Sequence, residues 1–368
     1  MDFTNLQAQY QLYKDEIHQE IQKVLNTSSY IGGESIARLE KGLGEFAHVP
    51  YVVACSSGTD AIILALMALG IGVGDEVITT PFTFIATAEA AAFLGAKVVF
   101  VDICPNTYNI NPSLIEEKIT SKTKAILPVS LYGQVCEIDE INSIAQQYNL
   151  SVIEDGAQSF GALYKGRHSC SLTPFAITSF FPSKPLGAYG DGGAIFVQSK
   201  EMEKKIRSLL SHGQVKRYMH QSIGMNARMD SLQASILCVK LKYFKEEIAK
   251  RQKVAKIYTQ SLISEGLDQW LKTPYIKPHN LSVFAQYSLY VKERDALREY
   301  LTSHSIPTAI HYPKPLHLQE AFASLGYKQG DFPISEEVSK HILSIPMSAF
   351  ITEDEQAEVV RRIKEFYS

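Results

Sequence analysis

Between about residues 50 and 200, short apolar runs alternate with longer segments that carry helical spacing. The apolar runs are 51–55, 76–80, 97–101, 124–129 and 150–155. The segments with helical spacing are 60–69, 85–94, 112–119 and 137–148. Such uniformly apolar strands are typical of a parallel sheet covered on both faces. The alternation therefore predicts a doubly wound α/β sheet, in which ligands bind beyond the carboxyl ends of the strands.

After Gly193 the alternation stops, and we expect a second, smaller domain. One more strand is expected over 194–198, then a helix over 200–211 and a long helix from 230 to about 263. Alternating residues over 283–291 indicate a half-buried antiparallel strand, with helices over 294–304 and 353–366. The sequence thus predicts a large α/β domain over 1–240 and an α+β domain over 241–368, contacted by the N-terminal helix.

Composition excludes several classes of function. With 36 basic and 39 acidic side chains, the chain lacks the positive field that nucleic-acid binding needs. Its most apolar run, 61–73, is shorter than the roughly 20 residues of a membrane helix and contains two glycines. The five cysteines lie far apart and the histidines form no H-x-x-x-H, so we expect neither a disulfide framework nor a metal site. The polar N-terminus lacks signal-peptide features, and we expect a cytoplasmic location.

Two polar motifs lie at the ends of predicted strands. In CSSGTDAIILAL (55–66) a strand leads into the start of a helix, where free backbone amides bind phosphate. Ordinary capping by Ser57 or Thr59 is the alternative there. In VIEDGAQSFGA (152–162), Asp155 ends an apolar strand, and a buried carboxylate needs a positive partner. A protonated pyridine nitrogen would supply that charge, and Gln158 is placed to face the same ligand.

Two further motifs follow. In TSFFPSKPLGAYGDGGAIF (178–196), Lys184 has only apolar, small, proline and glycine neighbours. Burial there would lower its pKa and make the amine a nucleophile for an aldehyde, while Ser179 offers a hydroxyl to a phosphate. In GMNARMDSLQAS (224–235), Asn226 and Arg228 precede a helix that Asp230 can cap. A phosphate cradle, a strand-end carboxylate and a buried lysine together describe pyridoxal phosphate (PLP) held as a Schiff base.

These motifs, together with PFTFIATAEA (81–90) and HYPKPLH (311–317), follow the order of the DegT/DnrJ type of sugar-nucleotide aminotransferases. The chain resembles this family of fold-type I PLP enzymes over essentially its whole length. The resemblance implies a mostly parallel seven-stranded sheet sandwiched by helices, with a smaller α+β domain. It also implies PLP as cofactor, L-glutamate and a sugar nucleotide as substrates, and a homodimer with shared active sites.

The resemblance implies a role for each motif. Catalysis falls to Lys184, which would form the Schiff base, and to Asp155, which would hold the ring nitrogen. Gln158 would contact the ring hydroxyl, and Phe84 would stack on the ring. The phosphate would be held by Gly58, Thr59 and Ser179, and Asn226 would reach it from the neighbouring subunit. Three further residues resemble contacts to the sugar nucleotide: Arg228, His311 and Tyr312.

Two segments are similar to one branch of the family. SKPLG (183–187) and NLSVFAQYSLYV (280–291) resemble the branch that acts at C3 of UDP-linked 2-acetamido-3-keto sugars, GlcNAc or its uronic acid, in the biosynthesis of surface polysaccharides such as lipopolysaccharide O-antigen. Two departures from the common family pattern are Pro185, where many members have Asn, and Gly156, where many have Ala. Lys184 excludes the branch of dehydratases that carries histidine at this position.

Three alternatives remain beside this interpretation. A C4 or dTDP-3-keto-6-deoxysugar aminotransferase of the same family would share every cofactor motif, because those residues recognise PLP and not the sugar. A dinucleotide-dependent oxidoreductase has only GIGVG (70–74) in its favour, and that run follows a helix and precedes a strand, the reverse of the required order. A non-catalytic sensor on the same scaffold is disfavoured by the joint retention of Lys184, Asp155 and Ser179.

Overall fold

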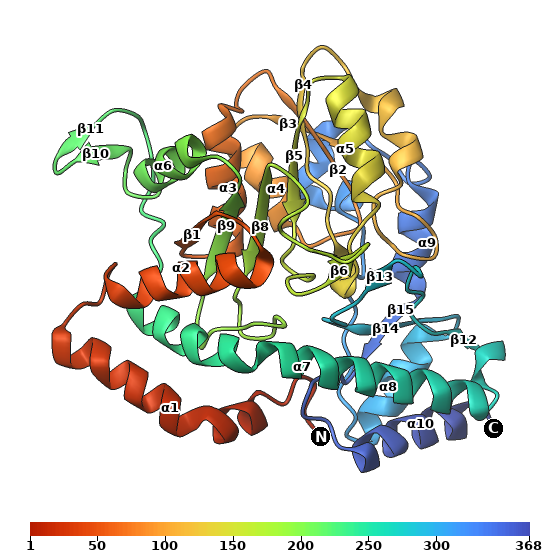
Figure 1. Ribbon diagram of the computed structural model, residues 1–368. Coiled ribbons are helices and arrows are strands. Elements are labelled where there is room, and N and C mark those ends of the chain that lie inside the picture. The colour runs from red at the N-terminus through yellow and green to blue at the C-terminus, as the bar shows by residue number, and fades with distance from the viewer.

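The computed structural model describes residues 1–368, and its large α/β part is built on one seven-stranded sheet (Figure 1). Six strands run parallel and β9 runs antiparallel to both of its neighbours. The strands, in spatial order, are β1 (Tyr51–Cys55), β9 (Gly193–Val197), β8 (Phe175–Ser179), β5 (Ser151–Asp155), β4 (Thr123–Ile126), β2 (Glu76–Thr79) and β3 (Lys97–Phe100). The predicted mostly parallel sheet is confirmed.

Helices cover both faces of the sheet because alternate strand residues point to opposite sides. Val52 and Ala54 of β1 belong to one apolar core, and Val53 and Cys55 belong to the other. The first core is covered by α2 (Glu34–Ala47), α5 (Ile138–Gln147) and the start of α7 (Ser231–Ser264). The second is covered by α3 (Gly58–Leu69), α4 (Ala86–Phe93) and α6 (Lys200–Leu209).

Two segments differ from the sequence-based expectation. The helix expected over 112–119 is instead a pair of 3₁₀ turns, η1 (Pro112–Leu114) and η2 (Glu116–Lys118). So short a segment has little helical stability of its own, and the Thr123 hydroxyl already accepts the backbone N–H of Thr120 at the turn into β4. Strand β8 was not expected at all, because no helix separates it from β5. The connection holds only β6 (Leu163–Tyr164) and β7 (Arg167–His168).

The 34-residue helix α7 crosses the lower half of the view and enters two cores in succession (Figure 1). Phe244 and Ile248 pack in the core of the large sheet, whereas Val254 and the residues after it pack in the smaller C-terminal part. The boundary proposed at residue 240 therefore falls inside this helix. Alongside it lies α1 (Leu6–Thr27). Just before α1, the carbonyl of Phe3 accepts the backbone N–H of Met347, which joins the N-terminus to the C-terminal part.

The C-terminal part is an antiparallel sheet with helices against it, as expected for an α+β unit. Its strands are β12 (Leu271–Lys272), β14 (Tyr287–Val291) and β15 (Ile342–Ile345), with α8 (Arg294–Ser303), α9 (Pro333–His341) and α10 (Glu353–Tyr367). Strand β14 begins four residues later than the expected start at 283. Short elements complete the chain: η3 (Leu131–Gly133), β10 (Gln214–Lys216), β11 (Met219–His220), η4 (Leu267–Gln269), β13 (Asn280–Leu281), η5 (Leu316–Leu318) and η6 (Glu320–Leu325).

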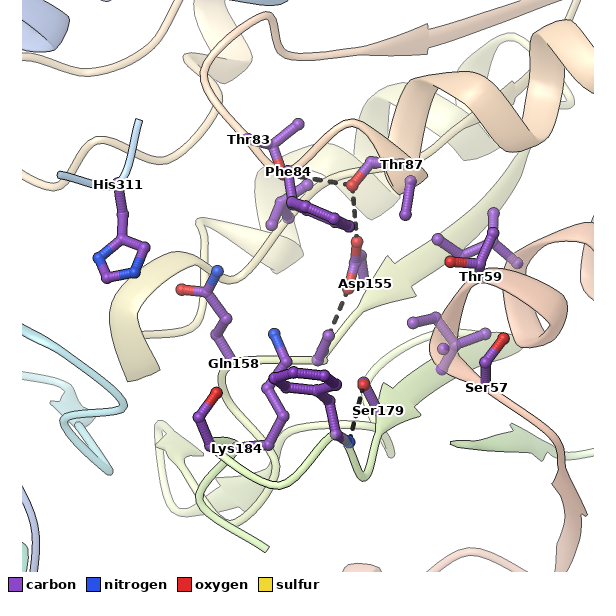
Figure 2. Close-up of a pocket in the computed structure, with 18 of the residues that line it drawn as sticks. Ser57, Thr59, Thr83, Phe84, Thr87, Asp155, Gln158, Ser179, Lys184 and His311 are labelled. Carbon is purple, nitrogen blue, oxygen red and sulfur yellow. Dashed lines mark hydrogen bonds between the residues drawn. The ribbon is translucent and has the colours of Figure 1, made fainter. Parts of the chain in front are cut away.

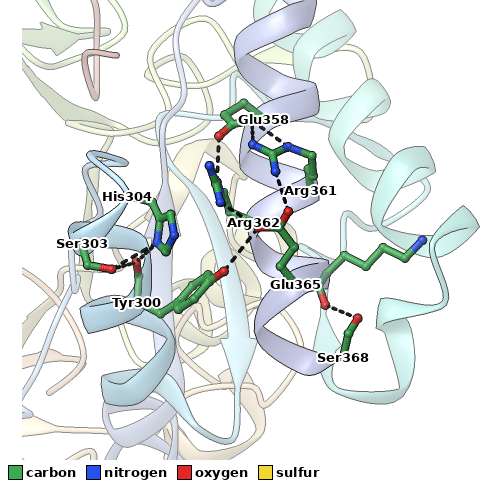
Figure 3. A network of polar contacts seen from close by, with 9 residues as sticks. Tyr300, Ser303, His304, Glu358, Arg361, Arg362, Glu365 and Ser368 are labelled. Carbon is green, nitrogen blue, oxygen red and sulfur yellow. Dashed lines mark hydrogen bonds and ion pairs between the residues drawn. The ribbon is translucent and has the colours of Figure 1, made fainter.

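Helices α8 and α10 are linked on their outer side by a polar network (Figure 3). The Tyr300 hydroxyl donates to Glu365 at 3.3 Å, and Arg361 and Arg362 pair with Glu358 and Glu365 along α10. Solvent screens exposed ion pairs of this kind, so the packing of the two helices rests mainly on their buried apolar faces. No helix of the structure combines the length and hydropathy needed to span a bilayer.

Candidate active site

A cavity of about 460 Å³ opens where the carboxyl ends of β1, β2, β5 and β8 face a loop of the C-terminal part (Figure 2). Nine of the eleven residues predicted for the site line it: Gly58, Thr59, Phe84, Asp155, Gln158, Ser179, Lys184, His311 and Tyr312. Asn226 and Arg228 do not line it. The volume lies within the range of small-molecule sites.

One end of the cavity is formed by the first turn of α3. The Ser57 hydroxyl accepts the backbone N–H of Asp60 at 3.0 Å and so caps the helix, as the alternative reading of this motif allowed. The amides of Gly58 and Thr59 come first in the helix, where no intrahelical partner exists. A Cβ on Gly58 would lie only 2.7 Å from the Cβ of Ser179, so glycine lets β8 approach the helix start. Free amides, a helix dipole and a hydroxyl therefore converge where a phosphate group would fit.

Asp155 lies buried at the carboxyl end of β5, and each of its two carboxylate oxygens accepts one hydrogen bond. Oδ1 accepts the backbone N–H of Ala157 at 3.1 Å, and Oδ2 accepts the hydroxyl of Thr87 at 2.8 Å. The Thr87 hydroxyl lies 3.2 Å from that of Thr83, which extends the chain of hydroxyls (Figure 2). Burial raises the pKa of Asp155, while its hydrogen bonds lower it. The carboxylate has no ion-pair partner in the chain and so fits a ligand that brings a positive charge, such as a protonated ring nitrogen.

Lys184 sits in the connection between β8 and β9 and projects into the cavity (Figure 2). Its backbone N–H donates to the carbonyl of Phe181 at 2.8 Å, which closes a tight turn. Gly187 lets the chain after Lys184 return close to Pro182, because a Cβ there would lie 2.3 Å from the carbonyl oxygen of Pro182. Burial lowers the pKa of Lys184, and the charge of Asp155 partly opposes that effect. A lysine in this state is a competent nucleophile toward an aldehyde.

The far wall of the cavity combines an oriented amide with aromatic rings. Gln158 accepts the backbone N–H of Tyr132 at 2.8 Å and donates to the Tyr312 hydroxyl at 3.1 Å, which fixes its orientation. Phe84 leaves 54% of its surface exposed at the cavity, a free ring face for an aromatic ligand. Burial and the charge of Lys184 lower the pKa of His311 to about 4, so its imidazole is neutral at pH 7. These side chains can bind and orient a flat, polar ring.

Asn226 and Arg228 occupy the chain just before α7, outside this cavity. Asn226 is exposed and forms a β-bridge with Ser211. Arg228 donates to the Ser211 hydroxyl at 3.3 Å, and its buried Nε has no partner. Within one chain, therefore, neither residue can serve the cavity described above.

Residues that were not predicted also line the cavity. Thr83 and Thr87 lie within PFTFIATAEA, and Gln286 lies within the segment 280–291, but nothing in their local sequence shows which face they present. The departure at Gly156 has a structural reason. A Cβ at this position would lie 2.6 Å from the sulfur of Cys170 and 3.0 Å from the carbonyl oxygen of Ile177, so glycine avoids crowding both atoms.

Comparisons with known proteins point to one family. The profile of the DegT/DnrJ/EryC1/StrS aminotransferase family matches residues 11–364. The UDP-2-acetamido-2-deoxy-3-oxo-D-glucuronate aminotransferase of Pseudomonas aeruginosa is 48% identical over 95% of this chain and 96% of its own. The UDP-N-acetyl-3-dehydro-α-D-glucosamine 3-aminotransferase of Acidithiobacillus ferrooxidans is 39% identical over 98% and 96%. The crystal structure of NtdA from Bacillus subtilis with bound cofactor PMP has a TM-score of 0.89 at 31% identity, over 96% of this chain and 81% of that one.

Proposed function

Since the chain belongs to the DegT/DnrJ/EryC1/StrS aminotransferase family, we propose that it moves an amino group from L-glutamate to the C3 keto group of a UDP-linked 2-acetamido-3-keto sugar. PLP is the cofactor of this reaction, and GlcNAc or its uronic acid is the sugar. The observation that carries the proposal is the joint placement of Lys184, Asp155 and the phosphate cradle around one cavity. The names of the two UDP-sugar relatives support the choice of C3 and of UDP.

Each wall of the cavity has a task in this reaction. When bound, PLP supplies an aldehyde for the amino group and a ring that accepts electrons. The amides of Gly58 and Thr59 and the hydroxyl of Ser179 hold its phosphate, and the carboxylate of Asp155 keeps its ring nitrogen protonated. The Nζ of Lys184 removes the proton from Cα of glutamate and later delivers one to C3 of the sugar, a general acid–base step. Its lowered pKa suits both transfers.

Removing the Thr87 hydroxyl is expected to move the acidic limb of the pH–rate profile to higher pH. The hydrogen bond from Thr87 lowers the pKa of Asp155, so Thr87→Val raises that pKa further above its usual value. As the pH falls, Asp155 then takes up its proton sooner and the ionised form that holds the ring nitrogen is lost. The measurement is kcat/KM for glutamate against pH. Thr87→Ser keeps the hydroxyl and should leave the acidic limb at the native pH. An acidic limb at the native pH in Thr87→Val would contradict the claim that the Thr87 hydrogen bond lowers the pKa of Asp155.

We further propose a homodimer in which Asn226 reaches the phosphate site of the neighbouring subunit, with Arg228 near its sugar nucleotide. The position of both residues outside their own cavity supports this arrangement. So does the hairpin of β10 and β11, which projects from the body of the molecule and exposes Val215, Tyr218 and Met219 (Figure 1). Exposed apolar side chains on a projecting element are typical of a surface that another chain covers.

Mixed dimers of two inactive variants are expected to recover activity. Asn226→Asp places a negative charge near the phosphate, and Lys184→Ala removes the nucleophile. In a mixed dimer one of the two sites keeps both native residues, so random pairing in a symmetric dimer predicts about a quarter of the native activity. The measurement is turnover after co-expression, with each variant alone as control. Absence of recovery, with mixed dimers confirmed by mass, would contradict shared sites.

A panel of keto-sugar nucleotides tests the substrate directly. The enzyme is expected to convert UDP-linked 3-keto-GlcNAc or its uronic acid, with NMR of the product placing the nitrogen on C3. Exclusive turnover of a dTDP-linked 3-keto-6-deoxysugar or of a 4-keto sugar would instead establish the alternative activity within the family.

The proposed location is the cytoplasm, and the proposed product is an amino sugar for surface polysaccharides. All five cysteines of the chain are free, which supports a reducing compartment. Fractionation of the native host, with an antibody against this chain, tests the location.

A further inference from the structure

Lys240, on helix α7, is a buried ammonium group that forms no ion pair in the structure. Only 1% of its surface is exposed. Its Nζ donates to the carbonyl oxygen of Gly187 and lies 4.9 Å from the centroid of the Tyr189 ring. The nearby carboxylate of Glu247 favours the charged form of Lys240 but accepts hydrogen bonds from the side-chain amide of Gln9, at 2.8 and 3.0 Å. Burial lowers the pKa of Lys240 to about 8.

Burying an ammonium group carries a large desolvation penalty. An apolar side chain of similar length would pack in the same position without the desolvation penalty of the charge. What it would not supply is a donor for the Gly187 carbonyl. Lysine at position 240 therefore supplies a directional hydrogen bond to the Gly187 carbonyl and a positive charge beside the Tyr189 ring, and both contacts fall on the same stretch of chain.

A second side chain of α7 holds the same stretch of chain. Gln233 lies seven residues before Lys240 and so on the same face of the helix. Its Oε1 accepts the backbone N–H of Tyr189 at 2.9 Å, and its Nε2 donates to the Tyr189 carbonyl at 3.5 Å. Residues 187–189 are thus tied to α7 at two points.

The tied stretch belongs to the lysine loop, which we define as residues 181–191. The loop folds back on itself, since the N–H of Ala188 donates to the carbonyl of Phe180 at 2.7 Å. The N–H of Lys184 donates to the carbonyl of Phe181 at 2.8 Å. Phe181, Ser183, Lys184 and Asp191 of this loop line the cavity. Fixing residues 187–189 therefore fixes the turn that aims Lys184 at the cofactor site.

We propose that Lys240 is a positioning residue, whose bond to the Gly187 carbonyl holds the lysine loop in the shape that presents Lys184 to the reacting atoms. Gln233 supports the same shape from the preceding part of the helix. Only the task given to Lys184 rests on the proposed function, because the tie between α7 and the loop is a property of the chain itself.

The test compares Lys240→Met with Lys242→Met in the full-length protein without added cofactor. Lys242 is a matched control, because it lies on the same helix but is exposed and pairs with Glu16 at 2.7 Å. Amide hydrogen exchange of the peptide that contains residues 180–192 is expected to become at least about tenfold faster in Lys240→Met, because local opening is no longer resisted by the tie. The other peptides of Lys240→Met, and all peptides of Lys242→Met, should exchange at the native rate.

The second readout is the half-reaction with glutamate. Misplacement of Lys184 should lower its rate constant by about 10- to 100-fold, while the KM for glutamate stays within about a factor of two. Native exchange in the lysine loop of a folded Lys240→Met protein would overturn the proposal. Should that variant fail to fold, Gln233→Met is judged by the same two readouts and the same criteria. If the chain proved to use another cofactor, the exchange experiment would still decide whether the tie exists.

Discussion

Replacing Lys184 with alanine is expected to abolish amino transfer, with a fall in kcat of at least about 1,000-fold. The substitution removes both the amine that forms the covalent link and the group that moves the proton, and positioned acid–base groups alone contribute about 10²–10⁴-fold. The cradle of Gly58, Thr59 and Ser179 is untouched, so PLP should still bind to the variant without the covalent link. The measurement is the glutamate-dependent release of the keto acid, in steady state and in a single turnover.

Lys204→Ala is the control for this experiment. Lys204 is an exposed lysine on α6 that does not line the cavity, and its loss should leave turnover native. Turnover of Lys184→Ala within about tenfold of the native rate would mean that another group carries the proton transfer, contrary to the general acid–base assignment.

The second large effect is expected at Asp155. Asp155→Asn keeps the size of the side chain and removes the charge that would hold the ring nitrogen protonated. Loss of a preorganised electrostatic contact of this kind lowers kcat by about 10²–10³-fold. The measurement is a rapid-mixing study of the half-reaction with glutamate, together with titration of the apoprotein with PLP, which should bind more weakly.

Glu154→Gln separates this effect from general damage to the strand. Glu154 is the neighbour of Asp155 in β5 but points to the opposite face of the sheet, where it accepts bonds from Ser130 at 3.1 Å, Ser169 at 2.8 Å and the backbone N–H of Cys170 at 2.9 Å. Its replacement should lower the melting temperature, while the loss of kcat should be much smaller than the loss in Asp155→Asn. Equal losses of kcat in the two variants would contradict a specific contact between Asp155 and the cofactor.

Features that depend on the pattern of residues within a short segment could be predicted from the sequence. The alternation of strands and helices, the strand-to-helix transition within 55–66 and the strand-end position of Asp155 are all properties of short segments. Lys184 stood out because its own neighbours are apolar, small or glycine. The structure places these residues around one cavity because parallel strands end at one edge of a sheet.

Features that depend on distant contacts could not be predicted. Thr87 bonds Asp155 across 68 positions of sequence, and Lys240 bonds Gly187 across 53. A threonine near a helix start and a lysine in a long helix look ordinary until the fold brings their partners near. Strand β8 escaped prediction because no helix separates it from β5, and its place in the sheet is fixed by pairing with β5 and β9.

Under the proposed function, discrimination between sugars falls to residues other than those that would hold PLP. Residues that would contact PLP recognise the cofactor and not the sugar, so they are not expected to distinguish C3 from C4. Among the predicted sugar contacts, His311 and Tyr312 come from the C-terminal part, and Arg228 would come from a partner subunit. In the proposed homodimer, the identity of the sugar would therefore depend on walls contributed by both subunits.

The proposed covalent link between Lys184 and the cofactor is tested most directly by reduction with borohydride after loading with PLP. Peptide mass mapping of the reduced protein should find the cofactor fixed to the peptide that contains Lys184, and to no other lysine. A reduced protein in which that peptide carries no cofactor mass would contradict the assignment of the site, and with it the proposed reaction.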